Sequence, residues 1–152
     1  SQVPIPHDLI GRLMADFPGI VVGIKDSSGD LENMQTMARR FPDLAVFSGA
    51  DPLLLPMMAQ GGAGCITAAA NLIAPDLRHV FDHWRDGDVA EAQARIEAWR
   101  ALSTRYVQIP TVKALIAHRL QDPAWAEPFP PMLPLTEAEQ NDIAQAAEAL
   151  TG

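Results

Sequence analysis

The sequence contains few residues of several chemically useful types, and each shortage excludes a class of protein. The only cysteine among 152 residues is Cys65, so no disulfide can form within the chain, which fits a reducing compartment. Lysine and arginine total 11 against 19 aspartate and glutamate residues, which gives a formal net charge of -8. A nucleic-acid partner is not expected, because binding phosphate backbones requires basic patches. No apolar run reaches the roughly 18 residues of a membrane span and no secretion signal opens the sequence, so we expect a cytoplasmic protein with no membrane contact.

Lysine is particularly scarce among the charged residues. Only Lys25 and Lys113 are present, against nine arginines. Arginine stays protonated in proteins, whereas lysine can lose its proton and act as a nucleophile, so the position of each lysine is informative. The hydrophobic share of 48% and the charged share of 20% are those of an ordinary folded domain.

Branched aliphatic runs alternate with helical patterns through the first half of the sequence. We expect strands over 20–24, 44–47 and 63–67, with the first strand buried on both faces. Apolar residues at helical spacing predict a helix before the first strand and another after each strand. Asp30 and Asp51 are expected to cap the helices that follow the first two strands.

This alternation of strands and helices indicates an α/β fold with a parallel sheet. Three short parallel strands are too few to form a sheet with both faces covered, so we expect residues 1–87 to be the C-terminal part of a (β/α)₈ TIM barrel. Residues 88–152 contain only helical patterns and are expected to form a C-terminal helical extension. There Asp88 is a candidate helix cap, and Thr136 with Glu139 has the spacing of a capping box. A complete small α/β domain is the alternative.

A lysine ends the first predicted strand. In parallel barrels the chemistry gathers at the carboxyl ends of strands, where Lys25 is expected to lie. A lysine held against an apolar interior loses its proton more easily, and the neutral amine can condense with a ketone to give an imine. The alternative is a lysine that reaches solvent at the rim and forms an ion pair with Asp26 or Asp30.

Four segments together resemble one family. The segments GIKDSSGD, FSGAD, GGAGCITAAAN and IPTVKALIA are similar, in this order, to segments of the dihydrodipicolinate synthase / N-acetylneuraminate lyase family. The resemblance spans nearly the whole chain. It implies a (β/α)₈ barrel with a helical extension, usually in a homotetramer, that binds pyruvate or a 2-keto-3-deoxy acid as an imine on a lysine. It also implies that no metal or organic cofactor takes part in the chemistry.

The same resemblance implies roles for individual residues. Lys25 matches the imine-forming lysine, and Ile66 matches the residue whose backbone carbonyl approaches the bound pyruvyl group. Ser27, Gly49 and Asp51 match positions that face the rest of the substrate. The reaction implied is aldol condensation or its reverse, and the remaining choices are an aspartate-semialdehyde-condensing synthase, a 2-keto-3-deoxy sugar acid aldolase and a related dehydratase.

Several departures from the family pattern limit this interpretation. Pro52 and Ala68 stand where sialic acid lyases present a carboxylate and a hydroxyl, which argues against a sialic acid substrate. The family's carboxylate-binding Gly-Thr-Thr loop and its proton-shuttling tyrosine have no counterpart, since Tyr106 lies in the helical region. We therefore expect these 152 residues to be inactive without an N-terminal half. A non-catalytic scaffold or oligomerisation module is the alternative function.

Overall fold

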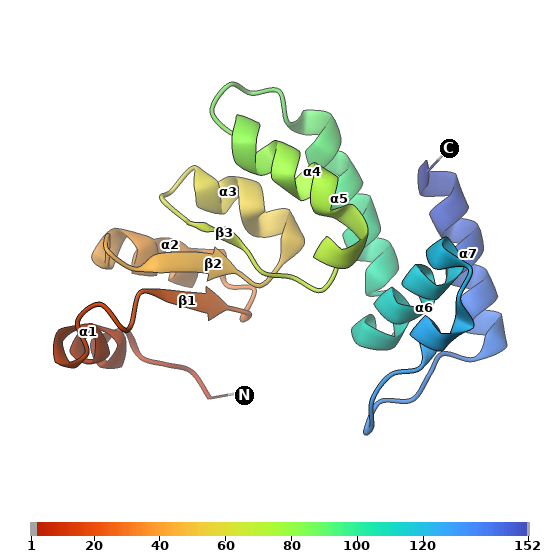
Figure 1. The fold of residues 1–152 in the computed structure, drawn as a ribbon. Helices are drawn as coiled ribbons and strands as arrows, with labels where there is room; N and C mark the ends of the chain where they lie inside the picture. The colour runs from red at the N-terminus through yellow and green to blue at the C-terminus, as the bar shows by residue number, and fades with distance from the viewer. Residues whose placement is uncertain (1–2, 152) are drawn as a thin grey trace. The chain divides into compact units, whose positions relative to one another are not determined.

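The computed structural model describes residues 3–151, and the chain divides into two compact units, residues 1–66 and 67–152. The first unit contains the sheet and the second consists of helices and connecting segments (Figure 1). The predicted boundary between a barrel part, residues 1–87, and a helical extension, residues 88–152, stays a prediction. Within residues 3–151, none of the helices combines the length and the apolar character needed to cross a membrane.

The first unit is built around a small parallel sheet. Its elements, in chain order, are α1 (His7–Asp16), β1 (Gly23–Asp26), α2 (Leu31–Arg40), β2 (Ala45–Ser48), the 3₁₀ helix η1 (Asp51–Leu53), α3 (Leu54–Met58) and β3 (Gly64–Cys65). The three strands run parallel in the order β1-β2-β3, with Asp26 opposite Ser48 and Ser48 opposite Cys65. The predicted α/β class with a parallel sheet is confirmed. The register brings the carboxyl ends of all three strands to one edge.

Helices α1 and α2 pack against this sheet through apolar side chains spaced at helical intervals. Met34 and Met37 of α2, Ile10 of α1 and Val46 of β2 are each at most 3% exposed and belong to one core cluster. Complete burial of such a side chain stabilises a fold by about 1.5–3 kcal/mol. The α2 helix begins where predicted, because the Asp30 carboxylate accepts a hydrogen bond from the Asn33 backbone N–H at 3.0 Å.

The first strand differs from its prediction. It begins at Gly23 rather than residue 20, and Ile20 and Val22 are 75% and 60% exposed, so the expectation of burial on both faces was wrong. A hydrogen-bonded turn at Phe17 delays strand pairing, because the Phe17 carbonyl accepts the Ile20 N–H at 3.1 Å. In the described chain β1 is also an edge strand, paired with β2 alone. The third strand is likewise shorter than predicted and covers only Gly64–Cys65.

Two predicted helix caps are absent from the described structure. Asp51 is the first residue of η1 and the capping position falls on Ala50, whose side chain makes no capping bond. Asp51 is instead fully buried, because the turn after β2 folds inward. Helix α5 (Ala90–Ser103) has Val89 in the capping position, so Asp88 does not cap it. Both predictions came from the sequence preference of aspartate at helix starts, and tertiary packing placed each residue elsewhere.

The second unit contains α4 (Ala70–His83), α5, α6 (Gln108–Leu120), the 3₁₀ helix η2 (Pro123–Ala126) and α7 (Glu137–Thr151). Helix α4 is kinked at Ile73, where φ is -126° and ψ is 25°, two residues before Pro75, as expected for a proline inside a helix. The capping box predicted at the start of α7 is confirmed. The Thr136 N–H donates to the Glu139 carboxylate at 2.8 Å, and the Glu139 N–H donates to the Thr136 hydroxyl at 3.3 Å.

Candidate active site at the strand ends

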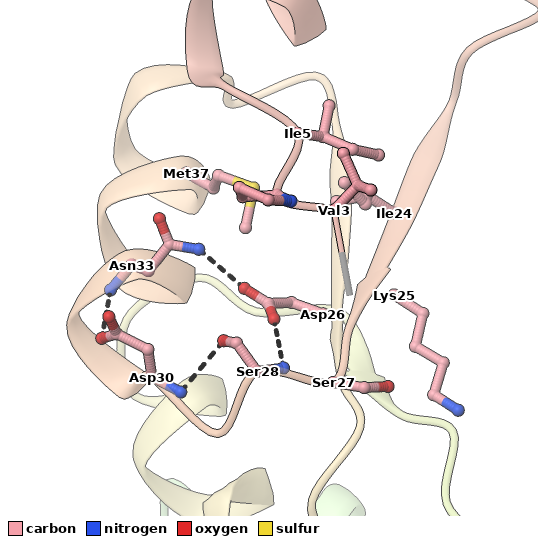
Figure 2. A pocket seen from close by; sticks show the side chains of 11 residues that line it. Val3, Ile5, Ile24, Lys25, Asp26, Ser27, Ser28, Asp30, Asn33 and Met37 are labelled. Atoms are coloured by element: carbon pink, nitrogen blue, oxygen red, sulfur yellow. Dashed lines mark hydrogen bonds between the residues drawn. The ribbon is translucent and has the colours of Figure 1, made fainter. Parts of the chain in front are cut away.

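Lys25 lies near the carboxyl end of β1, and within residues 3–151 its side chain is exposed rather than held against an apolar interior as the sequence interpretation expected. Side chains alternate across a strand, so Lys25 and Asp26 leave opposite faces, and Ser27 returns to the face of Lys25. Figure 2 shows the Lys25 side chain extending away from Asp26 and Asn33. No ion pair within residues 3–151 involves Lys25, so the alternative of a Lys25 pair with Asp26 or Asp30 is not found there. Its amine is therefore not held by a carboxylate of the described chain.

The neighbouring carboxylate of Asp26 is held in the turn that follows the strand. It accepts hydrogen bonds from the Ser28 backbone N–H and from the Asn33 side-chain amide, both at 2.7 Å (Figure 2). Partial burial raises the pKa of Asp26, but the bonds from Ser28 and Asn33 favour the anion more strongly, so its pKa lies below the ordinary value of 3.8. Asp26 is thus an anion at neutral pH whose oxygens face the turn.

The end of β2 packs tightly against this turn. The Gly49 N–H donates to the Asp26 carbonyl at 2.7 Å. A Cβ atom at position 49 would lie 2.8 Å from the same carbonyl oxygen and closer still to the Ser27 hydroxyl, so only glycine fits without displacement. The Ser48 hydroxyl, fully buried, donates to the Ala50 carbonyl at 2.9 Å and accepts the Ala50 N–H at 3.0 Å. These contacts fix Ser27 beside Gly49.

The end of β3 provides Ile66 and Cys65. Ile66 follows the strand, is 50% exposed, and donates its N–H to the Ser48 carbonyl at 2.9 Å. Cys65 is half-buried and is a free cysteine. Burial, with a smaller contribution from the charge of Asp51, raises the pKa of the Cys65 thiol to about 11, so the thiol remains protonated at neutral pH.

An open hollow of about 700 Å³ borders the carboxyl half of β1 (Figure 2). It is lined by residues 3–5, 24–28, Asp30, Asn33 and Met37. Of the five predicted site residues, Lys25 and Ser27 line this hollow, whereas Gly49, Asp51 and Ile66 do not. The roles predicted for all five from the family resemblance stay predictions.

Asn33 belongs to this region, although no sequence motif marks it. Asn33 lies in the first turn of α2 and bonds to Asp26, and its side-chain oxygen contacts His7 Nε2 at 2.9 Å. The only signal in the sequence was the position of Asn33 three residues after the Asp30 cap. That spacing places Asn33 in the first turn of the helix, close to the end of the preceding strand, but it does not identify a hydrogen-bond partner for its side chain.

Helix α4 carries two neighbouring histidines, His79 and His83, four residues apart. The rings of His79 and His83 have centroids 4.7 Å apart, and His83 Nδ1 lies 3.1 Å from the Asp86 carboxylate. His79 Nε2 contacts the backbone carbonyl of Asp88 at 2.7 Å instead. Within residues 3–151, no group of three or more histidine, cysteine or acidic side chains is arranged to hold a metal ion.

Comparison with known proteins gives a consistent result. The profile of the dihydrodipicolinate synthetase family matches residues 1–150. An uncharacterised DapA-like lyase of Chloroflexus aurantiacus is 36% identical over 99% of this chain and 50% of its own length. The 4-hydroxy-tetrahydrodipicolinate synthase of Methanopyrus kandleri is 38% identical over 74% of this chain and 38% of its own length.

Solved structures agree. Dihydrodipicolinate synthase from Agrobacterium tumefaciens matches with a TM-score of 0.84 and 29% identity, over 99% of this chain and 50% of that one. YagE from Escherichia coli, solved in complex with pyruvate, matches with a TM-score of 0.80 over 95% of this chain and 51% of its own, and its 23% identity supports the fold alone. The chain thus spans about half the length of the relatives that match nearly all of it.

Proposed function

The chain belongs to the dihydrodipicolinate synthetase family, and from this premise we propose that the natural protein containing it is a lyase or synthase acting through an imine on Lys25. The substrate is pyruvate or a 2-keto-3-deoxy acid. One observation carries the proposal: an exposed lysine at the carboxyl end of a parallel strand, which pairs with no carboxylate among residues 3–151. An amine free of such a pair is available to attack a carbonyl carbon.

In the proposed reaction the neutral amine of Lys25 adds to the keto carbon of the substrate. The carbinolamine then loses its hydroxyl as water, which requires a proton, and a protonated imine remains. This cation accepts the electron pair of a C–H or C–C bond at the neighbouring carbon, which gives an enamine. Breaking the C–H bond releases a proton to a base, and breaking the C–C bond releases an aldehyde together with the proton of its former hydroxyl group. In the synthetic direction the enamine attacks an aldehyde carbon, and hydrolysis of the new imine returns the free lysine.

The other predicted residues are proposed to surround this intermediate. The Ile66 carbonyl is proposed to approach the pyruvyl group, with Ser27, Gly49 and Asp51 nearer the remainder of the substrate. The proton donor is proposed to come from outside these residues. The hydroxyl of the single tyrosine, Tyr106, donates to Asp142 at 3.1 Å, and this residue does not match the family's proton-shuttling tyrosine. A general acid must lie within hydrogen-bond reach of the proton it transfers, so we expect the 152 residues alone to be inactive.

Borohydride trapping tests the proposal directly. The natural protein and the 152-residue chain are each incubated with pyruvate and borohydride, and the modified peptide is mapped by mass spectrometry. We expect the natural protein to gain one reduced pyruvyl group, located on Lys25, and a Lys113→Arg variant to be trapped equally well. Absence of an adduct in the natural protein, or an adduct on Lys113, would support the non-catalytic scaffold instead.

The aldehyde partner is tested after imine formation has been observed. Aspartate semialdehyde with pyruvate tests a condensing synthase, and a panel of 2-keto-3-deoxy sugar acids tests an aldolase or dehydratase. The mass of the protein in solution, measured by light scattering, tests the tetramer that the resemblance implies.

A further inference from the structure

A hydrogen-bonded chain of three side chains connects α1, α2 and β1 on the face of β1 opposite Lys25. His7 Nε2 contacts Asn33 Oδ1 at 2.9 Å, and Asn33 Nδ2 donates to Asp26 Oδ2 at 2.7 Å. Asn33 is therefore the central member, and both ends of its amide are used. The Asp26–Asn33 part of the chain is drawn in Figure 2.

The direction of these bonds follows from the chemistry of the groups. The Asp26 carboxylate is anionic and can only accept, so the Asn33 group that faces it must be the NH₂. The Asn33 oxygen then faces His7 and can only accept, so His7 Nε2 must carry a hydrogen. All three groups are satisfied when the Asn33 NH₂ faces Asp26 and the His7 hydrogen is on Nε2. Each bond is then donated in the direction from His7 to Asp26.

Asp26 is held at its backbone as well as at its side chain. Its carbonyl accepts the Gly49 N–H at 2.7 Å, while its carboxylate accepts the Ser28 N–H at 2.7 Å. The residues on either side, Lys25 and Ser27, extend from the other face of the strand. In the described chain β1 pairs with β2 alone. The backbone orientation from which Lys25 extends is therefore set by this pairing and by the bonds that hold Asp26.

We propose that Asn33 is a positioning residue for Lys25, and that His7 supports it from α1. By holding the Asp26 carboxylate, Asn33 fixes the strand end and thereby the direction of the lysine amine toward the substrate carbonyl. The proposal rests on the proposed imine chemistry of Lys25. A misplacement of about 1 Å at a reacting group can reduce a rate by roughly 100-fold, so a support of this kind has a measurable effect.

The test compares variants of the natural protein by their rate of imine trapping with borohydride at saturating pyruvate. Asn33→Ala is expected to slow trapping by about 10- to 100-fold. The pyruvate concentration that gives half of the maximal trapping rate should change by less than about threefold, since Asn33 contacts no substrate in this proposal. Glu32→Ala, an exposed neighbour on the same helix, is the matched control and should trap at the wild-type rate.

A pair of variants at position 7 separates positioning from packing. His7→Gln keeps an N–H donor that can reach Asn33 and should retain most of the trapping rate. His7→Leu fills similar space without a donor and should lose about fivefold, the factor that corresponds to one ordinary hydrogen bond. Melting temperatures measured alongside identify any variant that has lost its fold.

The outcomes distinguish this inference from the proposed function. If the wild type forms no adduct, the proposed function fails. If the wild type is trapped while folded Asn33→Ala is trapped equally fast, Asn33 is no positioning residue. Equal rates for the Gln and Leu variants at position 7 would show that His7 only fills space, and would remove it from the proposal.

Discussion

The carboxyl ends of β1 and β2 lie side by side in the sheet, but they differ in exposure. Asp26 is paired with Ser48 in the register, so the two ends are at the same level. At the end of β1, Lys25 and Ser27 are exposed. At the end of β2, Ser48 and Asp51 are fully buried.

This difference indicates that the two neighbouring strand ends have different roles, one presenting a reactive side chain and the other supporting the structure. In the turn after β2, the Ser48 hydroxyl bonds to both backbone groups of Ala50. Buried and internally bonded groups rigidify a structure but offer little to a ligand. The turn after β1 uses one face for such bonds and leaves the other face, with the lysine, open. We expect substitution of Lys25 to act mainly on chemistry and substitution of Ser48 mainly on stability.

Removal of the lysine is the sharpest test of this comparison. Lys25→Ala in the natural protein should reduce turnover by on the order of 10³-fold or more, because the nucleophile itself is lost. Lys25→Arg should be equally inactive, since arginine remains protonated. The melting temperature should change little, because Lys25 is exposed and unpaired within residues 3–151. A folded Lys25→Ala protein that turns over substrate normally would refute the assignment of chemistry to β1.

The contact between the two strand ends gives the next largest effect. Gly49→Ala places a Cβ atom 2.8 Å from the Asp26 carbonyl, so the backbone must shift and the free energy of unfolding should fall by about 1–3 kcal/mol. Denaturant unfolding measures the loss. The double variant Ser27→Ala with Gly49→Ala should recover little stability, because the clash with the Asp26 backbone remains. Full recovery would mean that only the Ser27 hydroxyl requires glycine at position 49.

Two serines at equivalent turns allow a matched comparison of stability. Ser48→Ala leaves the Ala50 N–H without its partner, although the Ala50 carbonyl still accepts the Leu53 N–H at 3.2 Å, and should cost about 1–3 kcal/mol of unfolding free energy. Ser28→Ala removes the exposed bond from the Asp30 N–H at 3.1 Å and the side-chain interaction of Ser28 with Asp26, and should cost about 0.5 kcal/mol. Chemical denaturation of both variants gives the values. Similar losses of unfolding free energy in the two variants would mean that the buried Ser48 contributes no more to stability than the exposed Ser28.

The sequence predicted the parts of the fold that depend on local patterns. The helices around the sheet follow from apolar spacing, and the Asp30 cap and the Thr136–Glu139 box follow from side chains that bond within a few residues of themselves. The parallel order of strands follows from their alternation with helices. Lys25 was identified because lysine is scarce in the sequence and this one directly follows an aliphatic run.

Features that depend on tertiary packing were not predictable from the sequence. Asp30 and Asp51 occupy similar places in the pattern, yet one caps a helix in solvent and the other is buried, because the turn after β2 folds inward. The exposure of Ile20 and Val22 depends on which strands lie beside β1, and a sequence of aliphatic residues does not specify that. The bonds of Asn33 join three elements and span 7 and 26 residues of the chain, beyond the reach of a local motif.

The smallest expected effect concerns the pH dependence of stability at the end of β1. The pKa of Asp26 is lowered in the folded chain, because its bonds to Ser28 and Asn33 outweigh the opposite effect of burial. The anion therefore stabilises the fold above the ordinary pKa of 3.8, and this contribution is lost as the pH falls through the lower folded value. Unfolding free energies of wild type and Asp26→Asn, measured from about pH 6 down to about pH 2, should differ most at the upper end and converge at the lower. Asn33→Ala, which removes the bond from the Asn33 amide to Asp26, should lie between them. A constant difference across the range would show that the Asp26 anion contributes nothing to the stability of the fold.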